Sequence, residues 1–207
     1  NRAERSIQQV MSQAHWTDVT TFLNTVTIGD LLVMTAVPLV YRDFSFVENA
    51  FDSTPWQEEL SDDLKDHWRA REHQGERARL IMHLLANARA RQARTVILSG
   101  DVHVGCLGIV KDTTKPGTTI NLHQVVSSGI VHPAPTQIQW MGILATTNDR
   151  SERLDENGHI CIEMLKAFGA GNYFRTRNFV TLETGTDNKL WVNWICENGE
   201  KPVYPLN

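Results

Sequence analysis

The sequence contains few cysteines, and those few are scattered. Its three cysteines, Cys106, Cys161 and Cys196, form no Cys-x-x-Cys pair. This spacing argues against a disulfide-stabilised scaffold and against a cysteine-rich zinc site. Because unpaired thiols persist in reducing surroundings, we expect a reducing compartment, with the cytoplasm favoured over an exported location.

The chain also lacks a cluster of basic residues and a long apolar run. Lysine and arginine together number 20 against 24 aspartates and glutamates, which leaves a net charge of −4. Nothing in this pattern could neutralise a row of phosphates, so we expect no nucleic-acid partner. The longest apolar run, Leu31 to Tyr41, is interrupted by Pro38. It is shorter than the roughly 18 to 20 residues that span a bilayer, so we expect no membrane span.

The chain does not begin with methionine. It opens at Asn1 and passes directly into a helix-like run, so we expect either a processed chain or a piece of a longer protein. The 207 residues, 41% of them hydrophobic, are enough for one globular domain or for part of a larger one.

What the sequence does contain is an alternation of helical and strand-like segments. The clearest helix runs from Gly75 to Gln92, with Ile81 and Leu84 on one stripe and arginines on the other. A β-branched strand, Thr95 to Ser99, follows after a short link, which is typical of α/β proteins. The apolar run Asp30 to Tyr41 predicts another strand, one that is covered on both faces of its sheet and runs into a loop at Pro38.

The second half of the chain predicts antiparallel strands. Cys106 to Lys111 and Ile120 to Ser127 have strand composition and are separated by a Lys-Pro-Gly turn. In the terminal region, residues 172–207, the alternation of apolar and polar residues over Leu190 to Cys196 predicts a hairpin. Residues 52–73 are rich in charge and weakly periodic, so we expect a long loop excursion there.

A loop with the chemistry of a metal ligand follows the strand that ends at Ser99. The stretch Ser-Gly-Asp-Val-His places Asp101 and His103 two residues apart, so both side chains point to one side if the chain stays extended. In α/β sheets, ligands bind at the carboxyl ends of strands. A carboxylate with an imidazole suits iron, manganese or zinc, and the carboxylate also suits calcium. The alternative is that Asp101 caps a turn and His103 is a half-exposed loop histidine.

Four segments, taken in order, make the sequence resemble a known family. They are Asp62 to Trp68, Glu76-Arg77, Val96 to His103 and Val125 to Val131. In this order and spacing they resemble the alkaline phosphatase D-like, or PhoD-like, branch of the calcineurin-like metallophosphoesterases, and the resemblance covers nearly the whole chain. It implies an α/β sandwich of two mixed β-sheets flanked by helices. It also implies a centre of two or more metal ions that hydrolyses phosphate esters through metal-activated water.

The resemblance further assigns site residues. Asp101 and His103 match the family's last metal-binding motif, which implies that they bind metal and take part in catalysis; iron, calcium, manganese and zinc all stay open. Asp66 and His67 match a segment near the mouth of the active site, and His132 follows a matched strand end. We therefore expect these three residues to face the substrate or to support the metal ligands. The alternative for Asp66 and His67 is a solvated, charged loop.

Several other polar residues have less specific surroundings. We expect His83 at the boundary of its helix, His123 pointing outward from its strand, and Cys106 packed within a strand. Ser127 and Ser128 are consistent with donors to a phosphoryl oxygen and equally consistent with a polar strand end.

The chain departs from the family in one respect. The family's earlier ligand motifs, Gly-Asp-x-x-Asp and Gly-Asn-His, do not occur in it. We therefore expect residues 1–207 to be the C-terminal portion of a PhoD-like domain, completed by the N-terminal half of the same protein. The substrate would be a phosphate ester, and the isolated chain would lack activity. The alternative is a catalytically inactive PhoD-like domain with a structural or protein-interaction role.

Overall fold

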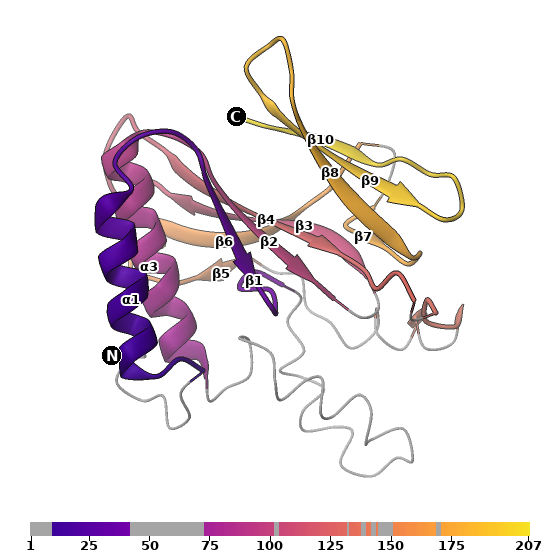
Figure 1. Ribbon diagram of the computed structural model, residues 1–207, viewed down its shortest axis with the longest axis horizontal. Helices are drawn as coiled ribbons and strands as arrows, with labels where there is room; N and C mark the ends of the chain where they lie inside the picture. The colour runs from indigo at the N-terminus through magenta and orange to yellow at the C-terminus, as the bar shows by residue number, and fades with distance from the viewer. Residues whose placement is uncertain are drawn as a thin grey trace.

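The fold has three layers, with two helices on one face of a large β-sheet and a smaller sheet on the other (Figure 1). The computed structural model describes residues 10–41, 73–101, 104–131, 133–137, 140–141, 144, 151–168 and 171–207. The predicted α/β class and the two sheets are confirmed. The predicted excursion over 52–73 lies outside the described residues except for its last position.

Within the described residues, the large sheet has seven strands. Its order is β1 (Leu31–Thr35), β2 (Thr95–Gly100), β4 (Ile120–Ser127), β3 (Gly105–Asp112), β6 (Ile160–Leu165) and β5 (Glu152–Arg153), and β7 (Tyr173–Phe174) pairs with the start of β3. Strands β1, β2 and β4 are parallel, while β3 is antiparallel to both β4 and β6. The carboxyl ends of β1, β2, β4 and β6 therefore lie along one edge, which we call the carboxyl edge.

The helical layer consists of α1 (Gln13–Thr25) and α3 (Gln74–Arg91), which lie side by side (Figure 1). Helix α3 confirms the predicted helix, and its buried apolar residues recur at helical spacing against the sheet. It ends where Gln92 adopts a left-handed conformation and donates its N–H to the carbonyl oxygen of Ala88. Because α3 runs into β2 through a short link, its N-terminus lies toward the carboxyl edge.

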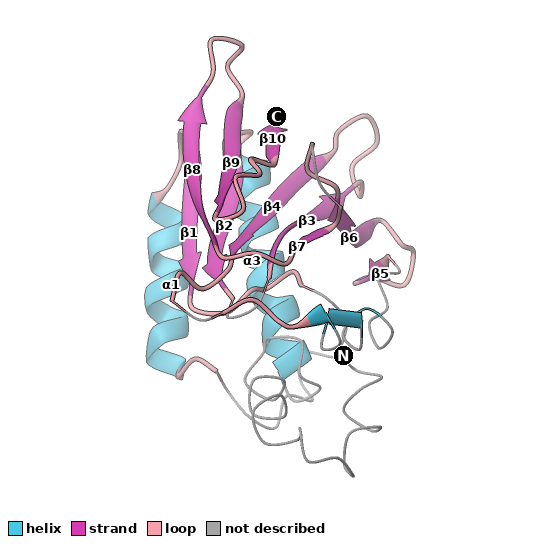
Figure 2. Ribbon diagram, turned by 90° about the vertical axis from the view of Figure 1, so that its right-hand side faces the viewer, coloured by secondary structure: helices cyan, strands magenta, loops and turns pink. Residues whose placement is uncertain are grey.

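The small sheet closes the opposite face of the large one (Figure 2). It is antiparallel and consists, within the described part of the chain, of β10 (Val203–Leu206), β9 (Leu190–Cys196) and β8 (Asn178–Thr184). Strand β9 buries every second residue, as the alternation predicted, and Trp194 is fully buried between the sheets. The Trp194 indole N–H donates a 3.0 Å hydrogen bond to the carbonyl oxygen of Val126, which joins the two sheets.

The prediction that the strand within Asp30 to Tyr41 is covered on both faces is wrong. The strand is β1, which ends at Thr35, and its Leu32 and Met34 are 50% and 85% exposed. Both side chains share a face with Val96 of the neighbouring strand, which the small sheet covers. The small sheet does not reach over the edge strand β1, so this face of β1 is open.

The structure also describes the cysteines and the hydrophobicity of the helices. The three cysteines, all within the described residues, form no disulfide with one another, and Cys106 is buried in β3 as predicted. None of the helices in the described ranges is long and apolar enough to span a bilayer.

Candidate functional site

Asp101 is the first residue after β2, and its backbone extends the pairing of β2 with β4. Its N–H donates a 2.8 Å hydrogen bond to the carbonyl oxygen of Ser127. Its carboxylate Oδ2 accepts a 2.9 Å hydrogen bond from the N–H of Val104. Since the main chain and the side chain are both held, the half-buried carboxylate has a defined orientation at the carboxyl edge.

The hydrogen bond between Asp101 and Val104 connects the two ends of the link from β2 to β3. Strands β2 and β3 lie on opposite sides of β4. The Asp101 carboxylate that accepts from Val104 has the turn-capping role considered above. An ionised carboxylate offers two oxygens and about four acceptor positions. Capping this turn is therefore compatible with binding a cation.

Of the five residues that the sequence assigned to the site, the structure describes Asp101. His103, Asp66, His67 and His132 lie outside the described residues. The convergence of Asp101 with His103 therefore stays a prediction, and so do the substrate-facing roles of the other three.

The donor chemistry at Asp101 suits a hard metal ion. A carboxylate oxygen is a preferred ligand of such ions, and a hydrogen bond to the carboxylate, as from Val104, is the support that ligating carboxylates usually have. Among the residues that the structure describes, no group of three or more His, Cys, Asp or Glu side chains could hold a metal ion. A catalytic centre needs about three protein ligands. Asp101 therefore suits one ligand position and requires further donors beside it.

A fully buried glutamine fixes the segment that follows β1 against the centre of the sheet. Gln124 of β4 accepts hydrogen bonds from the N–H groups of Leu39, at 2.9 Å, and Val40, at 3.3 Å. Its side-chain amide donates to the hydroxyl of Ser99 at 3.0 Å. Because Ser99 is two residues before Asp101, this one side chain couples the exits of β1 and β2.

Arg77 of α3 is fully buried, so the prediction that the arginines of this helix lie on the stripe opposite its apolar residues is wrong for Arg77. Its guanidinium donates to both carboxylate oxygens of Glu152 at 3.1 Å, and its Nε donates to the carbonyl oxygen of Leu39. This bidentate pairing explains how a charge is accommodated inside. Arg77 lies four residues before Ile81 and so shares the buried face of the helix, where its partners come from β5 and from the segment after β1.

The neighbouring Glu76 is buried for a different reason. Its carboxylate accepts hydrogen bonds from the N–H of Val10, at 2.6 Å, from the N–H of Met11, at 2.9 Å, and from the indole of Trp16, at 2.7 Å. These contacts attach the entrance of α1 to the N-terminal turn of α3. The Glu-Arg pair that contributed to the family resemblance therefore has structural roles.

Ser128 takes part in a buried network at the end of β4. Its hydroxyl donates to the carbonyl oxygen of Thr176 at 2.9 Å, and it accepts from the backbone N–H and the side-chain amide of Asn178, at 3.0 and 3.1 Å. The network links the large sheet to the start of β8. Of the two readings of this serine, the structure supports the polar strand end.

His123 is 4% exposed, so the expectation that it points outward is wrong. It lies in β4 between Val96 of β2 and Ile109 of β3, and its Nδ1 is buried without a hydrogen-bond partner. Burial lowers the pKa of this imidazole from 6.5 to about 4. His123 is therefore neutral at physiological pH. The sequence around His123 carried no signal for this burial, because the face of β4 on which His123 lies is covered by the small sheet, whose strands come much later in the chain.

Comparisons with known proteins match the chain to a phosphatase-related family. A family model described as "PhoD related phosphatase" matches residues 53–166, which is more than half of the chain and includes Asp101. The "Uncharacterized protein YGR266W" of Saccharomyces cerevisiae is 31% identical over 133 residues, an alignment that covers 52% of this chain and 19% of the yeast protein. The chain thus spans about a fifth of the length of that relative. No solved structure matches it.

The matched range and the geometry of the carboxyl edge lead to one assignment. The range contains α3, β2, β3 and β4, which together position Asp101 at the strand ends. The chain therefore belongs to the family of PhoD related phosphatases.

Proposed function

We propose that the protein containing this chain hydrolyses phosphate esters in a metal-dependent reaction, and that Asp101 and His103 are two of its metal ligands. The observation that carries this proposal is the position of Asp101, a hydrogen-bonded carboxylate at the carboxyl ends of parallel strands in a chain of a phosphatase family. We further propose that residues 1–207 are the C-terminal portion of the domain. The remaining ligands would come from the N-terminal half of the same protein.

The metal ions and the site residues have different proposed roles. Divalent or trivalent ions, whether iron, calcium, manganese or zinc, would when bound supply charge that polarises phosphoryl oxygens and acidifies water. Asp101 contributes an oxygen donor whose orientation is set by the N–H of Val104, and His103 contributes an imidazole nitrogen. Asp66, His67 and His132 are proposed to contact the substrate or to orient the ligands. The cytoplasm remains the proposed location.

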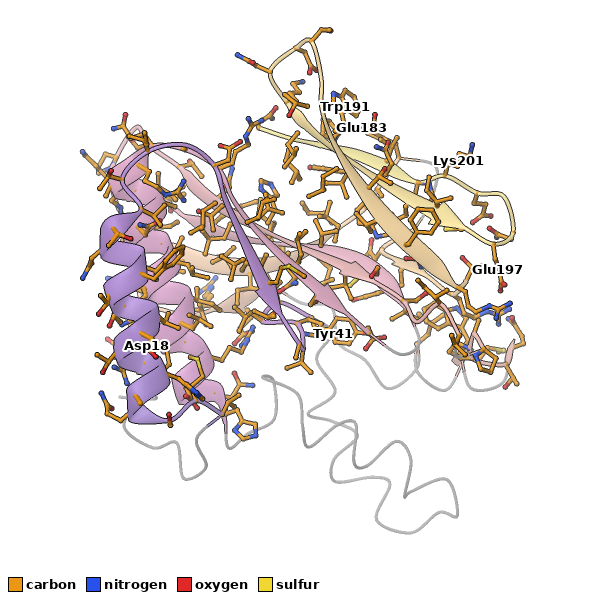
Figure 3. The ribbon with its side chains drawn as sticks, viewed as in Figure 1. Asp18, Tyr41, Glu183, Trp191, Glu197 and Lys201 are labelled. Atoms are coloured by element: carbon orange, nitrogen blue, oxygen red, sulfur yellow. The ribbon has the colours of Figure 1, made fainter. Side chains whose placement is uncertain are left out.

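The test compares the full-length protein with the variant Asp101→Asn. The amide keeps an oxygen that can accept from the N–H of Val104 but removes the negative charge. Glu183→Gln is the matched control, because Glu183 is an exposed carboxylate on the small sheet. Figure 3 shows it well away from Tyr41, which lies at the same carboxyl edge as Asp101. Turnover of an aryl phosphate monoester and a diester is measured, together with bound metal by elemental analysis.

We expect Asp101→Asn to lose turnover by about 100-fold or more and to retain less metal, with Glu183→Gln unchanged. Equal metal content and turnover in Asp101→Asn and the wild type would remove Asp101 from the centre. An inactive full-length wild type with metal supplied would support the catalytically inactive domain with a structural or protein-interaction role.

A further inference from the structure

Strand β1 lies at one end of the large sheet and has an unprotected edge. Among the described strands, only β2 pairs with it. Its five residues, Leu31–Thr35, include no charged residue and no proline. An apolar edge strand invites pairing with a further strand, so proteins usually protect their edges with charges, proline, bulges or very short strands. At the opposite end of the sheet β5 has this protection, because it consists only of Glu152 and Arg153. The contrast indicates that β1 is paired in the complete protein.

The backbone of β1 offers hydrogen-bonding groups on the side away from β2. The N–H of Leu31 donates a 2.9 Å hydrogen bond to the carbonyl oxygen of Arg94, next to β2. In a strand, the N–H and C=O groups of successive residues point to opposite sides. Those of Leu32 and Met34 therefore point toward the open edge. They can form a hydrogen-bonded ladder with an added strand.

The side chains of the same two residues are exposed on a face that the small sheet covers elsewhere. Leu32 lies beside Val96, and Met34 lies beside Leu98, and both of these neighbours pack in the core between the sheets. Leu32 is 50% exposed, Met34 is 85% exposed, and Ile28, in the link before β1, is 83% exposed. Strands of parallel sheets are normally buried on both faces. A contiguous exposed apolar surface of this kind marks an interaction site.

The position of this edge suits the N-terminal half of the same protein. Asp101 requires further donors beside it, and the described residues contain no group of side chains that could hold a metal ion. A strand that paired in parallel with β1 would end at the carboxyl edge, two strand spacings or about 10 Å from the end of β2. The aligned part of the yeast relative is 19% of its length, so that protein has ample further chain for such a strand.

We propose that a strand from the N-terminal half of the same protein pairs in parallel with the open edge of β1 and covers Leu32 and Met34. This extends the large sheet and its carboxyl edge beyond β1. The inference rests on the proposed function in one respect, namely that residues 1–207 are the C-terminal portion of a domain.

The first test is hydrogen exchange in the full-length protein, measured by mass spectrometry with resolution of single amides and with EDTA present. We expect the amides of Leu32 and Met34 to exchange at least about 100-fold more slowly than in an unstructured peptide, independently of protein concentration. The amide of Leu31 is the internal control, because it donates to Arg94 in any case. Rapid exchange of Leu32 and Met34 with a protected Leu31 would overturn the inference. Protection that depends on protein concentration would overturn it in favour of a second copy.

The second test identifies the segment that covers β1. Photo-leucine and photo-methionine, which are nearly isosteric with the natural residues, are incorporated into the full-length protein, and cross-linked peptides are sequenced. We expect Leu32 and Met34 to cross-link within one polypeptide to a segment that precedes residue 1, with the site reached by Leu32 before the site reached by Met34. The reverse order would refute parallel pairing. Cross-links to residues within 1–207 or to a second molecule, or reaction with water alone, would overturn the inference.

Neither test depends on hydrolysis. An inactive protein in which β1 is protected and cross-linked as expected would refute the proposed function alone. A protein that loses turnover in Asp101→Asn but exchanges Leu32 and Met34 rapidly would refute the present inference alone.

Discussion

Acidification should destabilise the protein through His123. The imidazole is 4% exposed, its Nδ1 has no hydrogen-bond partner, and burial lowers its pKa from 6.5 to about 4. In the unfolded chain the same side chain takes up a proton as the pH falls through about 6.5. Between these two values the unfolded state binds more protons than the native state. The free energy of unfolding therefore falls as the pH is lowered through this window.

The size of the effect follows from the two pKa values. Each unit of difference corresponds to about 1.4 kcal/mol, so His123 should cost about 3 kcal/mol by pH 4, and nothing above about pH 7. This is a large fraction of the 5 to 15 kcal/mol that is typical of folded domains. The contribution should be visible even though other groups titrate in the same range.

The assay is urea unfolding of wild type and His123→Leu at several values between pH 7 and pH 4. Leucine removes the titrating group and the unpartnered nitrogen. The difference in unfolding free energy should therefore shift in favour of the variant by about 3 kcal/mol over this range. Replacing Gln13, which is exposed on α1 and carries no titrating group, with alanine serves as the control and should leave the pH profile parallel to that of wild type. Parallel profiles for wild type and His123→Leu would refute the reasoning.

Three further predictions concern the packing around the site. Arg77→Met should lower the free energy of unfolding by roughly 3 kcal/mol, because Glu152 and the Leu39 carbonyl lose their partner. The double variant with Glu152→Leu should recover part of this loss of stability. Urea midpoints that show no recovery in the double variant would contradict this account. Gly108→Ala should lower the free energy of unfolding by about 1 to 3 kcal/mol, because the new Cβ would clash with a methyl of Val40. In the control Gly100→Ala the new Cβ would meet no atom within 4 Å, so its stability should stay within about 0.5 kcal/mol of wild type. Both are measured in one thermal-melting series. Ser128→Ala should lower the free energy of unfolding by about 1 to 3 kcal/mol, because it leaves donors of Asn178 without an acceptor. The KM for an aryl phosphate should stay unchanged. A raised KM in a stable variant would instead place Ser128 against the substrate.

The elements that local pattern could predict were predicted correctly. Helix α3, strand β2 and the alternating strand β9 each carry a periodic signal within a few residues of the sequence, and the structure has them near the expected bounds. The strand β1 was expected to be covered on both faces because its residues are apolar. Its exposure depends on how far the small sheet extends, which no residue of β1 determines.

The roles of buried polar residues were the main failure of prediction. Arg77 was grouped with the other arginines of its helix, but it lies on the buried face, and Glu152, 75 positions away, pairs with it inside the protein. His123 and Gln124 are adjacent in β4, yet the Nδ1 of His123 has no hydrogen-bond partner, whereas the side chain of Gln124 has several. Such differences arise from contacts between elements that are far apart in sequence, so local composition carries no trace of them.

The sequence by itself determined the α/β class, the family resemblance and the choice of Asp101 and His103, because a strand followed by Ser-Gly-Asp-Val-His is a local signal. Only the tertiary structure decided how Asp101 is held, since its partners Ser127 and Val104 meet it across the end of β4. Strand pairing sets which distant side chains share an edge, and that is a property of the whole fold.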